Sequence, residues 1–355
     1  MHLGRKLPCA TAAGVKTKTC AYIRRAMKTP PKLYRYRPLE DGLLDRELAA
    51  LRDSYLYAPP FAAMNDPMEA FYETGGPGDR IINAMLAPAG KRFDSMYDML
   101  SEMIDRFALV SFAGTYEDLP MWAYYGSNFG GMCLEFDTAE LAIGDFQSEK
   151  LRPVTYARDA LPPLTITDMA PERLEEAVIA RITRKRAEWA HEKEWRFITG
   201  EIGPKHYLDD ALRRVFLGPR VKPEHAARVC EILDRRPVEV LQGEIRGFEL
   251  RFRSIKPARP TDECERVGAG RFEPQDIIYK QDELEAFVGG GLDALLDECR
   301  RIALRPNLEE IADFDISANH KGTLFILAIY KLRSGRDVYH KRYFDRQMCI
   351  LPEKD

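Results

Sequence analysis

The sequence lacks the marks of three classes of protein. Its seven cysteines are far apart in 355 residues and form no CxxC pair, which argues against a disulfide scaffold and structural zinc and indicates a reducing compartment. The longest apolar run, at 323–330, is far shorter than the roughly 20 residues that cross a bilayer. A hydrophobic fraction of 45% is too high for a disordered chain. We therefore expect a soluble, globular, cytoplasmic protein that has no membrane partner.

Common catalytic signatures are missing too. The chain contains no Walker loop, HExxH, GxSxG, kinase motif or zinc-deaminase signature. The six histidines do not cluster in the sequence, and only His191, next to Glu192, adjoins a polar motif. These absences remove several enzyme classes, and no metal cofactor is predicted.

Positive charge is concentrated at the N-terminus. Residues 1–37 hold ten Lys and Arg and no Asp or Glu, so this stretch carries +10 and the remainder −13. Residues 1–32 show neither helical periodicity nor a secretory apolar run. We expect 1–32 to be a basic, disordered leader, in which residues 1–26 are either an arm or lie upstream of the true start at Met27.

Strands and helices are expected to alternate irregularly after the leader. Because there is no βαβ rhythm and no GxGxxG, we predict an α+β fold with a mixed, mostly antiparallel central sheet flanked by helices. Residues 33–257 are expected to form the core domain, and 258–355 a C-terminal α+β appendage with a helix interrupted at 289–291 and a hairpin at 323–344. Strands are expected at 33–37, 55–57, 107–112, 132–136, 194–198, 215–218, 238–241 and 248–252, and helices at 45–52, 91–105, 119–125, 171–190 and 223–234.

The densest polar motif is Lys185-x-x-x-Trp189-x-x-Glu192-x-Glu194-x-Arg196, which runs from the long helix expected at 171–190 into the following strand. On a strand, Glu194, Arg196 and Ile198 share one face, so charged groups lie where a buried strand usually keeps apolar ones. One interpretation is an ordinary ion pair on an edge strand. The other is a carboxylate that accepts a hydrogen bond from a ligand hydroxyl or stabilises a developing positive charge.

Two further motifs are candidates for ligand binding. Asn65, Asp66 and Glu69 project from one loop, which is either ordinary turn chemistry, a polar recognition loop or a site for a hard divalent cation. Trp122 and Tyr125 lie one helical turn apart, as core residues or as a platform for a planar ring.

Basic residues occur in two further places of interest. Arg35 and Arg37 alternate with tyrosines on the first expected strand, so an inward-facing arginine is a candidate phosphate contact. The C-terminal hairpin interleaves basic and aromatic residues, which is typical both of a nucleic-acid surface and of a solvated hairpin face. These hairpin residues are Tyr330, Lys331, Arg333, Arg336, Tyr339, Lys341, Arg342 and Tyr343.

A series of short motifs runs through residues 33–253 in a fixed order and spacing. They are Leu33-Tyr34-Arg35-Tyr36-Arg37, Leu56-Tyr57, Asn65-Asp66-Pro67-x-Glu69, Ser111-Phe112, Met121-Trp122-x-x-Tyr125, Gly131-x-Cys133-Leu134-Glu135-Phe136, Trp189-x-x-Glu192-x-Glu194-x-Arg196 and Val215-Phe216-Leu217-Gly218. In this order and spacing the motifs resemble those of the widespread bacterial family called domain of unknown function 2971. The resemblance implies a domain boundary and a set of motifs, and it implies no reaction.

The chain order of several residues is also similar to that of ADP-ribosyltransferase-like proteins, an analogy of architecture only. This analogy implies that Arg35 contacts the pyrophosphate of NAD, that Tyr57, or Trp122 with Tyr125, flanks the nicotinamide, and that Glu194 stabilises the oxocarbenium-like transition state. The expected function is a nucleotide-ligand enzyme acting on NAD, in bacterial defence or as a toxin. The alternatives are a metal-dependent nuclease that uses Asp66, Glu69, Glu192 and Glu194, and a non-enzymatic nucleic-acid or ligand-binding module.

Overall fold

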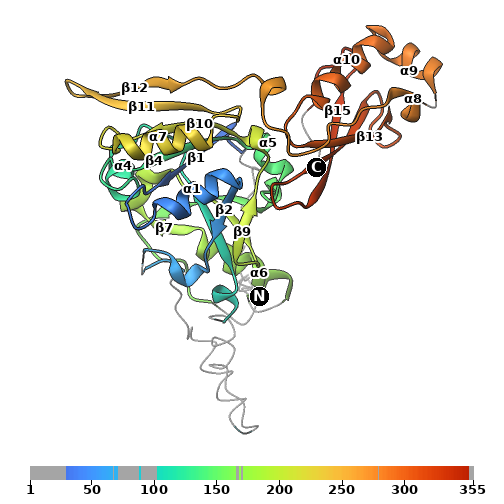
Figure 1. Ribbon diagram of the computed structural model, residues 1–355. Coiled ribbons are helices and arrows are strands. Elements are labelled where there is room, and N and C mark those ends of the chain that lie inside the picture. The colour runs from blue at the N-terminus through green and yellow to red at the C-terminus, as the bar shows by residue number, and fades with distance from the viewer. Residues whose placement is uncertain are drawn as a thin grey trace, which may run out of the picture.

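The computed structural model describes residues 29–66, 68–70, 88, 102–164, 168, 171–278 and 280–351. Residues 1–28 of the expected leader and most of the helix expected at 91–105 lie outside these ranges. The described part has the predicted α+β fold, with mostly antiparallel strands that form several sheets instead of one central sheet (Figure 1). Within it, no helix is long and apolar enough to cross a membrane.

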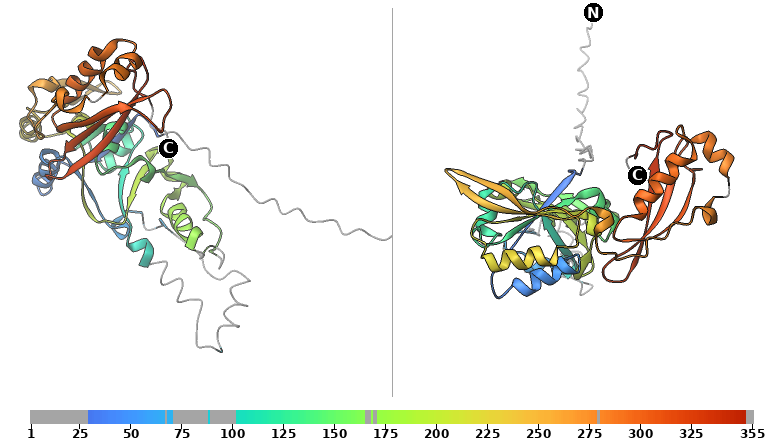
Figure 2. Two further views of the ribbon diagram at one scale, coloured as in Figure 1. Left: turned by 90° about the vertical axis from the view of Figure 1, so that its right-hand side faces the viewer. Right: turned by 45° about the horizontal axis from the view of Figure 1, so that its top comes forward.

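The largest sheet has five strands in the order β1 (Lys32–Arg37), β4 (Met132–Asp137), β10 (Leu212–Leu217), β11 (Glu239–Arg246) and β12 (Glu249–Lys256). Neighbouring strands are antiparallel except for the parallel pair β10 and β11. Helices α1 (Leu44–Arg52) and α7 (Pro223–Ile232) lie side by side below this sheet (Figure 2). Strands β11 and β12 form a long hairpin at its edge (Figure 1).

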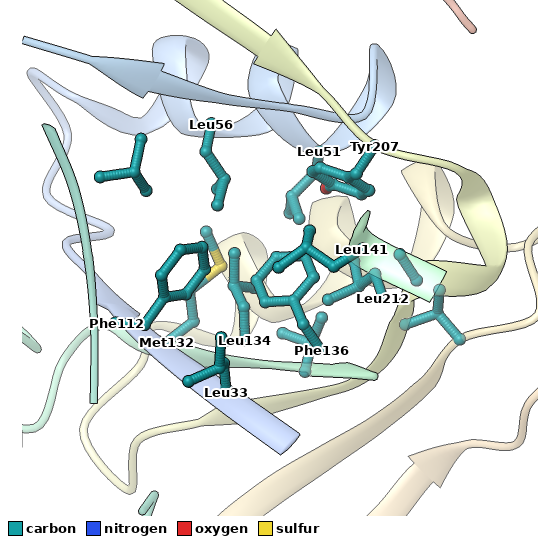
Figure 3. Packing of buried hydrophobic residues seen from close by; sticks show 14 of the residues in the cluster. Leu33, Leu51, Leu56, Phe112, Met132, Leu134, Phe136, Leu141, Tyr207 and Leu212 are labelled. Atoms are coloured by element: carbon teal, nitrogen blue, oxygen red, sulfur yellow. The ribbon is translucent and has the colours of Figure 1, made fainter. Parts of the chain in front are cut away.

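The two faces of this sheet bury different residues because side chains alternate along each strand. Leu33, Leu134 and Phe136 face the main hydrophobic cluster, where they pack with Leu51 of α1 (Figure 3). The residues between them face a second, more aromatic cluster, which contains Tyr34, Tyr36, Trp122, Cys133 and Phe216.

A second sheet positions the polar motif. Its order is β3 (Ala108–Phe112), β8 (Trp195–Thr199) and β5 (Leu151–Pro153), so β8 is the central strand. Trp195 and Phe197 join the main cluster while Ile198 joins another, and the expected alternation is therefore confirmed.

Two short strand pairs and three helices complete this region. Strand β2 (Tyr55–Ala58) pairs with β9 (Gly203–His206), and β6 (Thr155–Ala157) pairs in parallel with β7 (Arg184–Arg186). The helices are α4 (Leu119–Tyr124), α5 (Thr138–Ile143) and α6 (Pro171–Ile182).

The prediction of one long helix at 171–190 is wrong for the second half of this range. Helix α6 ends at Ile182, and the hydroxyl of Thr183 donates to the Ile179 carbonyl at 2.6 Å. The chain then forms β7 and a 3-10 helix at Ala187–Glu192. Pairing of β7 with β6 and burial of Lys185 outweigh the local helical pattern of these residues.

The C-terminal segment contains α8 (Pro274–Ile277), α9 (Gln281–Phe287), α10 (Gly291–Ala303) and a three-stranded sheet of β13 (Leu308–Ile316), β14 (Leu324–Lys331) and β15 (Asp337–Phe344). The interrupted helix and the hairpin predicted here are present, and Figure 2 shows both beside the large sheet. This segment has its own hydrophobic cluster, to which Ile143 and Leu208 of the preceding region also belong. The domain limits at 32/33 and 257/258 stay predictions.

Candidate ligand-binding site

Arg196 and Glu194 form a buried ion pair at the centre of the second sheet. Arg196 has no exposed surface, and its guanidinium donates two hydrogen bonds to Glu194, at 2.8 Å from Nε to Oε1 and 3.1 Å from Nη2 to Oε2. Its Nη1 donates to the carbonyl of Ile182 at the end of α6. Arg196 therefore lies on a central strand, which Glu194 directly precedes in sequence, and the edge-strand interpretation is excluded.

Three carboxylates converge on Lys185. Its ammonium nitrogen lies 3.1 Å from Glu69 Oε1, 2.7 Å from Glu192 Oε2 and 2.9 Å from Glu194 Oε2. Glu69 also approaches Arg196 Nη2 at 2.8 Å. We call these five residues, Glu69, Lys185, Glu192, Glu194 and Arg196, the Lys185 cluster. The ammonium group occupies the point where the carboxylates meet, which is where a bound cation would otherwise lie.

The charges within the Lys185 cluster shift the pKa values of several of its members. Burial alone would raise the pKa of Glu194, but the charges of Arg196 and Lys185 outweigh it and lower this pKa to about 2. For Glu69, burial is the stronger influence and raises the pKa. The pKa of Lys185 is raised, because the three carboxylates outweigh its burial. Glu194 is therefore an anion at neutral pH.

A cavity of about 390 Å³ opens beside this cluster. We call it the site cavity. Six of the ten predicted site residues line it: Arg35, Asn65, Tyr125, Glu192, Glu194 and Arg196. Lys185, Tyr34, Tyr36, Arg37 and Tyr124 also contribute to its wall. Its volume is in the range of pockets that hold small organic ligands.

Arg35 is the unpaired cation of the site cavity. Its Nη1 donates to the carbonyl of Ser111, and its buried Nε has no hydrogen-bond partner. Among the described residues no carboxylate lies within ion-pair distance of Arg35, whereas the neighbouring Arg37 pairs with Glu47. Burial, helped by the charge of Arg37, lowers the pKa of Arg35 to about 9. At neutral pH the side chain is still a cation with unused donor capacity.

A chain of hydrogen bonds connects the cavity rim to the cluster. The side chain of Asn65 donates to Tyr125 Oη at 2.9 Å, and Tyr125 Oη donates to Glu192 Oε1 at 2.7 Å. Glu192 in turn accepts from Lys185. Tyr125 is thus fixed by its hydroxyl while it lines the cavity.

The helix α4 presents a different aromatic residue from the one predicted. Trp122 has no exposed surface and packs edge-on against Tyr36, with its Nε1 donating to the Tyr116 carbonyl at 2.8 Å. It belongs to the aromatic cluster and does not line the site cavity. Tyr124, two residues later, lies at the cavity with 67% of its surface exposed. The helical spacing could not decide which aromatic faces the core.

The other predicted residues surround the cavity without lining it. Tyr57 is half exposed and lines a pocket of about 60 Å³ that shares Arg35 with the site cavity. Asp66 is buried and accepts the backbone N–H of Met68 at 2.9 Å, which is ordinary turn chemistry. Glu69 lies behind the wall, in contact with Lys185 and Arg196.

Residue reasoning missed Lys185, which is the centre of the cluster. The motif included Lys185, but the helix expected there gave no sign that its side chain is buried, so it was not selected as a site residue. Tyr124 was missed as well. The signal for Lys185 was its place at the start of the densest polar motif, and for Tyr124 its position next to Tyr125.

Basic residues of the C-terminal hairpin mostly form ion pairs within the chain. Arg333 pairs with Asp209 at 2.8 Å, Arg342 with Glu140 at 2.7 Å, and Arg336 with Asp145. Tyr330 has no exposed surface. These contacts attach the segment to the preceding region, and they account for most of the basic pattern without a nucleic acid.

The described region is thus an α+β protein with a cavity bordered by a buried charge cluster and an unpaired arginine. Residues 121–197, which extend from α4 into β8, match the family described as protein of unknown function (DUF2971). For these residues the match agrees with the resemblance that the motifs indicated. No curated protein and no solved structure matches the chain.

Proposed function

We propose that the site cavity binds a nucleotide-like ligand that carries phosphate, specifically NAD, and that the protein is an ADP-ribosyltransferase-like enzyme. The observation that carries this proposal is Arg35, a cation facing the cavity with no carboxylate partner among the described residues. Charge-assisted hydrogen bonds to a phosphate would complete its bonding. Tyr124 and Tyr125 supply aromatic surface for a planar ring.

In the proposed reaction, Glu194 is the catalytic residue for cleavage of the bond between nicotinamide and ribose. The bond between ribose C1 and the nicotinamide nitrogen breaks, and its electron pair leaves with nicotinamide. The ionised carboxylate of Glu194 accepts a hydrogen bond from a ribose hydroxyl and stabilises the positive charge on the ribose. Water or a hydroxyl of an acceptor then forms a bond to C1 and releases a proton. Roles in defence or as a toxin are part of this proposal.

One observation favours a second candidate, a nucleotide-binding module that does not turn over its ligand. Arg196 and Lys185 compensate the charge of Glu194, which weakens its effect on a developing cation. The metal-dependent nuclease is less favoured, because Lys185 already occupies the centre of the carboxylates. If a nuclease activity exists, it should be lost on addition of a chelator.

A matched pair of variants separates these candidates. Glu194→Gln and Glu69→Gln each remove one carboxylate from Lys185 and Arg196, but only Glu194 lines the cavity. Purified protein is incubated with NAD, and released nicotinamide is quantified by mass spectrometry. We expect release by the wild type and by Glu69→Gln and none by Glu194→Gln. Equal release by both variants would contradict the catalytic role of Glu194. Saturable NAD binding without release would identify the binding module.

A further inference from the structure

A second cavity lies next to the site cavity and has a strongly basic wall. Its volume is about 320 Å³, and Lys185 lines both cavities. We call it the basic pocket. One acidic side chain, Asp159, lines it together with five cations: Arg158, Arg181, Arg184, Lys185 and Arg186. All of these cations except Lys185 lie outside the site described above.

Two of these cations have no carboxylate partner among the described residues. Arg184 donates to the backbone carbonyl of Asp159 at 2.6 Å. Arg181, only 7% exposed, donates to the carbonyls of Ala177 and Pro162, and its Nε has no partner. Among the described residues no ion pair joins Arg158 or Arg184 to a carboxylate, whereas the charge of Asp168 acts on Arg181, Arg186 pairs with Glu188 and Lys185 belongs to its cluster. The pocket therefore has an excess of positive charge.

The rest of the wall is apolar and small. Met68 is 53% exposed, and Leu161 and the alanines Ala70, Ala157 and Ala160 complete the lining. A flat ring can lie against such a surface while the arginines bind an anion. A cavity of this volume suits one mononucleotide, not a long strand.

We propose that the basic pocket binds a nucleoside monophosphate, with the phosphate held by Arg158 and Arg184 and the base against Met68 and Leu161. This site is separate from the one proposed for NAD. Its residues come from the loop around Met68, from the segment at 157–161 and from the turn of α6 into β7. Arg181 adds a fixed charge from the interior, because its two backbone hydrogen bonds hold the guanidinium in place.

The test is calorimetric titration of AMP into protein in which the site cavity is disabled by Arg35→Gln. In this background we expect one remaining site. The double change Arg158→Gln/Arg184→Gln should weaken it about tenfold or more, as expected for the loss of charge-assisted hydrogen bonds. The matched control is Arg251→Gln/Arg253→Gln, which removes the same charge from exposed arginines on β12, and it should leave the affinity unchanged.

Titrations with inorganic phosphate and with adenosine measure separately how much the phosphate and the nucleoside contribute to the affinity for AMP. Both should bind at least about tenfold more weakly than AMP. Adenosine binding as tightly as AMP would contradict the role of the arginines, and phosphate binding as tightly as AMP would contradict the base contact. If AMP does not bind to Arg35→Gln but binds to the wild type, the basic pocket is not a site while the site cavity remains one.

Discussion

Two buried clusters of ion-paired side chains in this molecule differ in their surroundings. In the first, which we call the Asp209 cluster, Asp209 is fully buried between Arg236 and Arg333, at 2.8 Å from each. Its Oδ1 also accepts from the hydroxyl of Ser54. Neither Asp209 nor Arg236 lines the site cavity or the basic pocket. By contrast, four of the five members of the Lys185 cluster line the site cavity.

The comparison shows that buried ion pairs alone do not identify a functional site. Removing one partner of either cluster leaves an uncompensated charge in the interior, so both contribute to the integrity of the fold. In addition, the Lys185 cluster borders a cavity whose lining also includes the unpaired Arg35. We expect substitutions in the Asp209 cluster to change stability only, and those around the site cavity to change ligand binding.

The largest effect on stability is expected from Asp209→Asn. The variant leaves the buried Arg236 without its ion-pair partner and leaves Arg333 with Glu265 alone, which costs about 3–5 kcal/mol of unfolding free energy. Urea denaturation followed by circular dichroism measures this loss. NAD affinity of the folded fraction should be unchanged, and a selective loss of NAD binding in stable protein would break the distinction between the clusters.

Glu194→Gln should lower stability in a pH-dependent way. The folded pKa of about 2 lies below the ordinary value of 4.5, so the ion pairs of Glu194 stabilise the fold fully above about pH 4.5 and progressively less toward pH 2. The wild type should exceed the variant by about 3 kcal/mol at pH 7, with the difference shrinking below pH 4.5. Urea unfolding at a series of pH values measures it. A difference independent of pH would contradict the assigned ion pairs.

Arg35→Gln should show the opposite pattern from Asp209→Asn. Arg35 has no carboxylate partner among the described residues, and burial disfavours its charged form, so we expect stability to be unchanged or slightly higher. NAD affinity should fall by about 1.5–3 kcal/mol, the usual value of hydrogen bonds to charged groups. Thermal unfolding and calorimetry on the same sample measure both. A destabilised variant with intact NAD affinity would reverse the interpretation of Arg35.

The smallest effect is expected from Tyr124→Ala. Because Tyr124 is largely exposed, its loss should leave the unfolding free energy within about 0.5 kcal/mol of the wild type. Loss of a ring contact should reduce NAD affinity by about 1 kcal/mol, as measured by the same titration. Trp122→Phe is the control within α4, since Trp122 is buried away from the cavity, and it should affect stability without affecting affinity.

The local pattern of apolar and polar residues was sufficient to predict much of the fold. The alternation around Arg35 and the motif ending at Arg196 predicted strands that are present as β1 and β8. The α+β class and the C-terminal hairpin were also predicted correctly. Pattern failed where pairing between distant segments decides the structure: β7 replaces predicted helix because it pairs with β6, almost thirty residues earlier in the sequence.

The candidate site was predictable only in part. Arg35 and Glu194 could be singled out because charged residues are unusual on buried strands, and both line the site cavity. Their partners could not be found in the same way. Lys185 is identified only by three distances to carboxylates. Tyr124, for which no role was predicted, lines the cavity while Trp122 is buried, because helical spacing does not specify which face is covered.

The most direct test of the central claim is a crystal structure of the protein soaked with ADP-ribose. The account predicts electron density in the site cavity, with a phosphate oxygen within hydrogen-bond distance of the Arg35 guanidinium and a ribose hydroxyl next to Glu194. An empty site cavity, with ADP-ribose absent or bound only in the basic pocket at a concentration that saturates binding in solution, would contradict it.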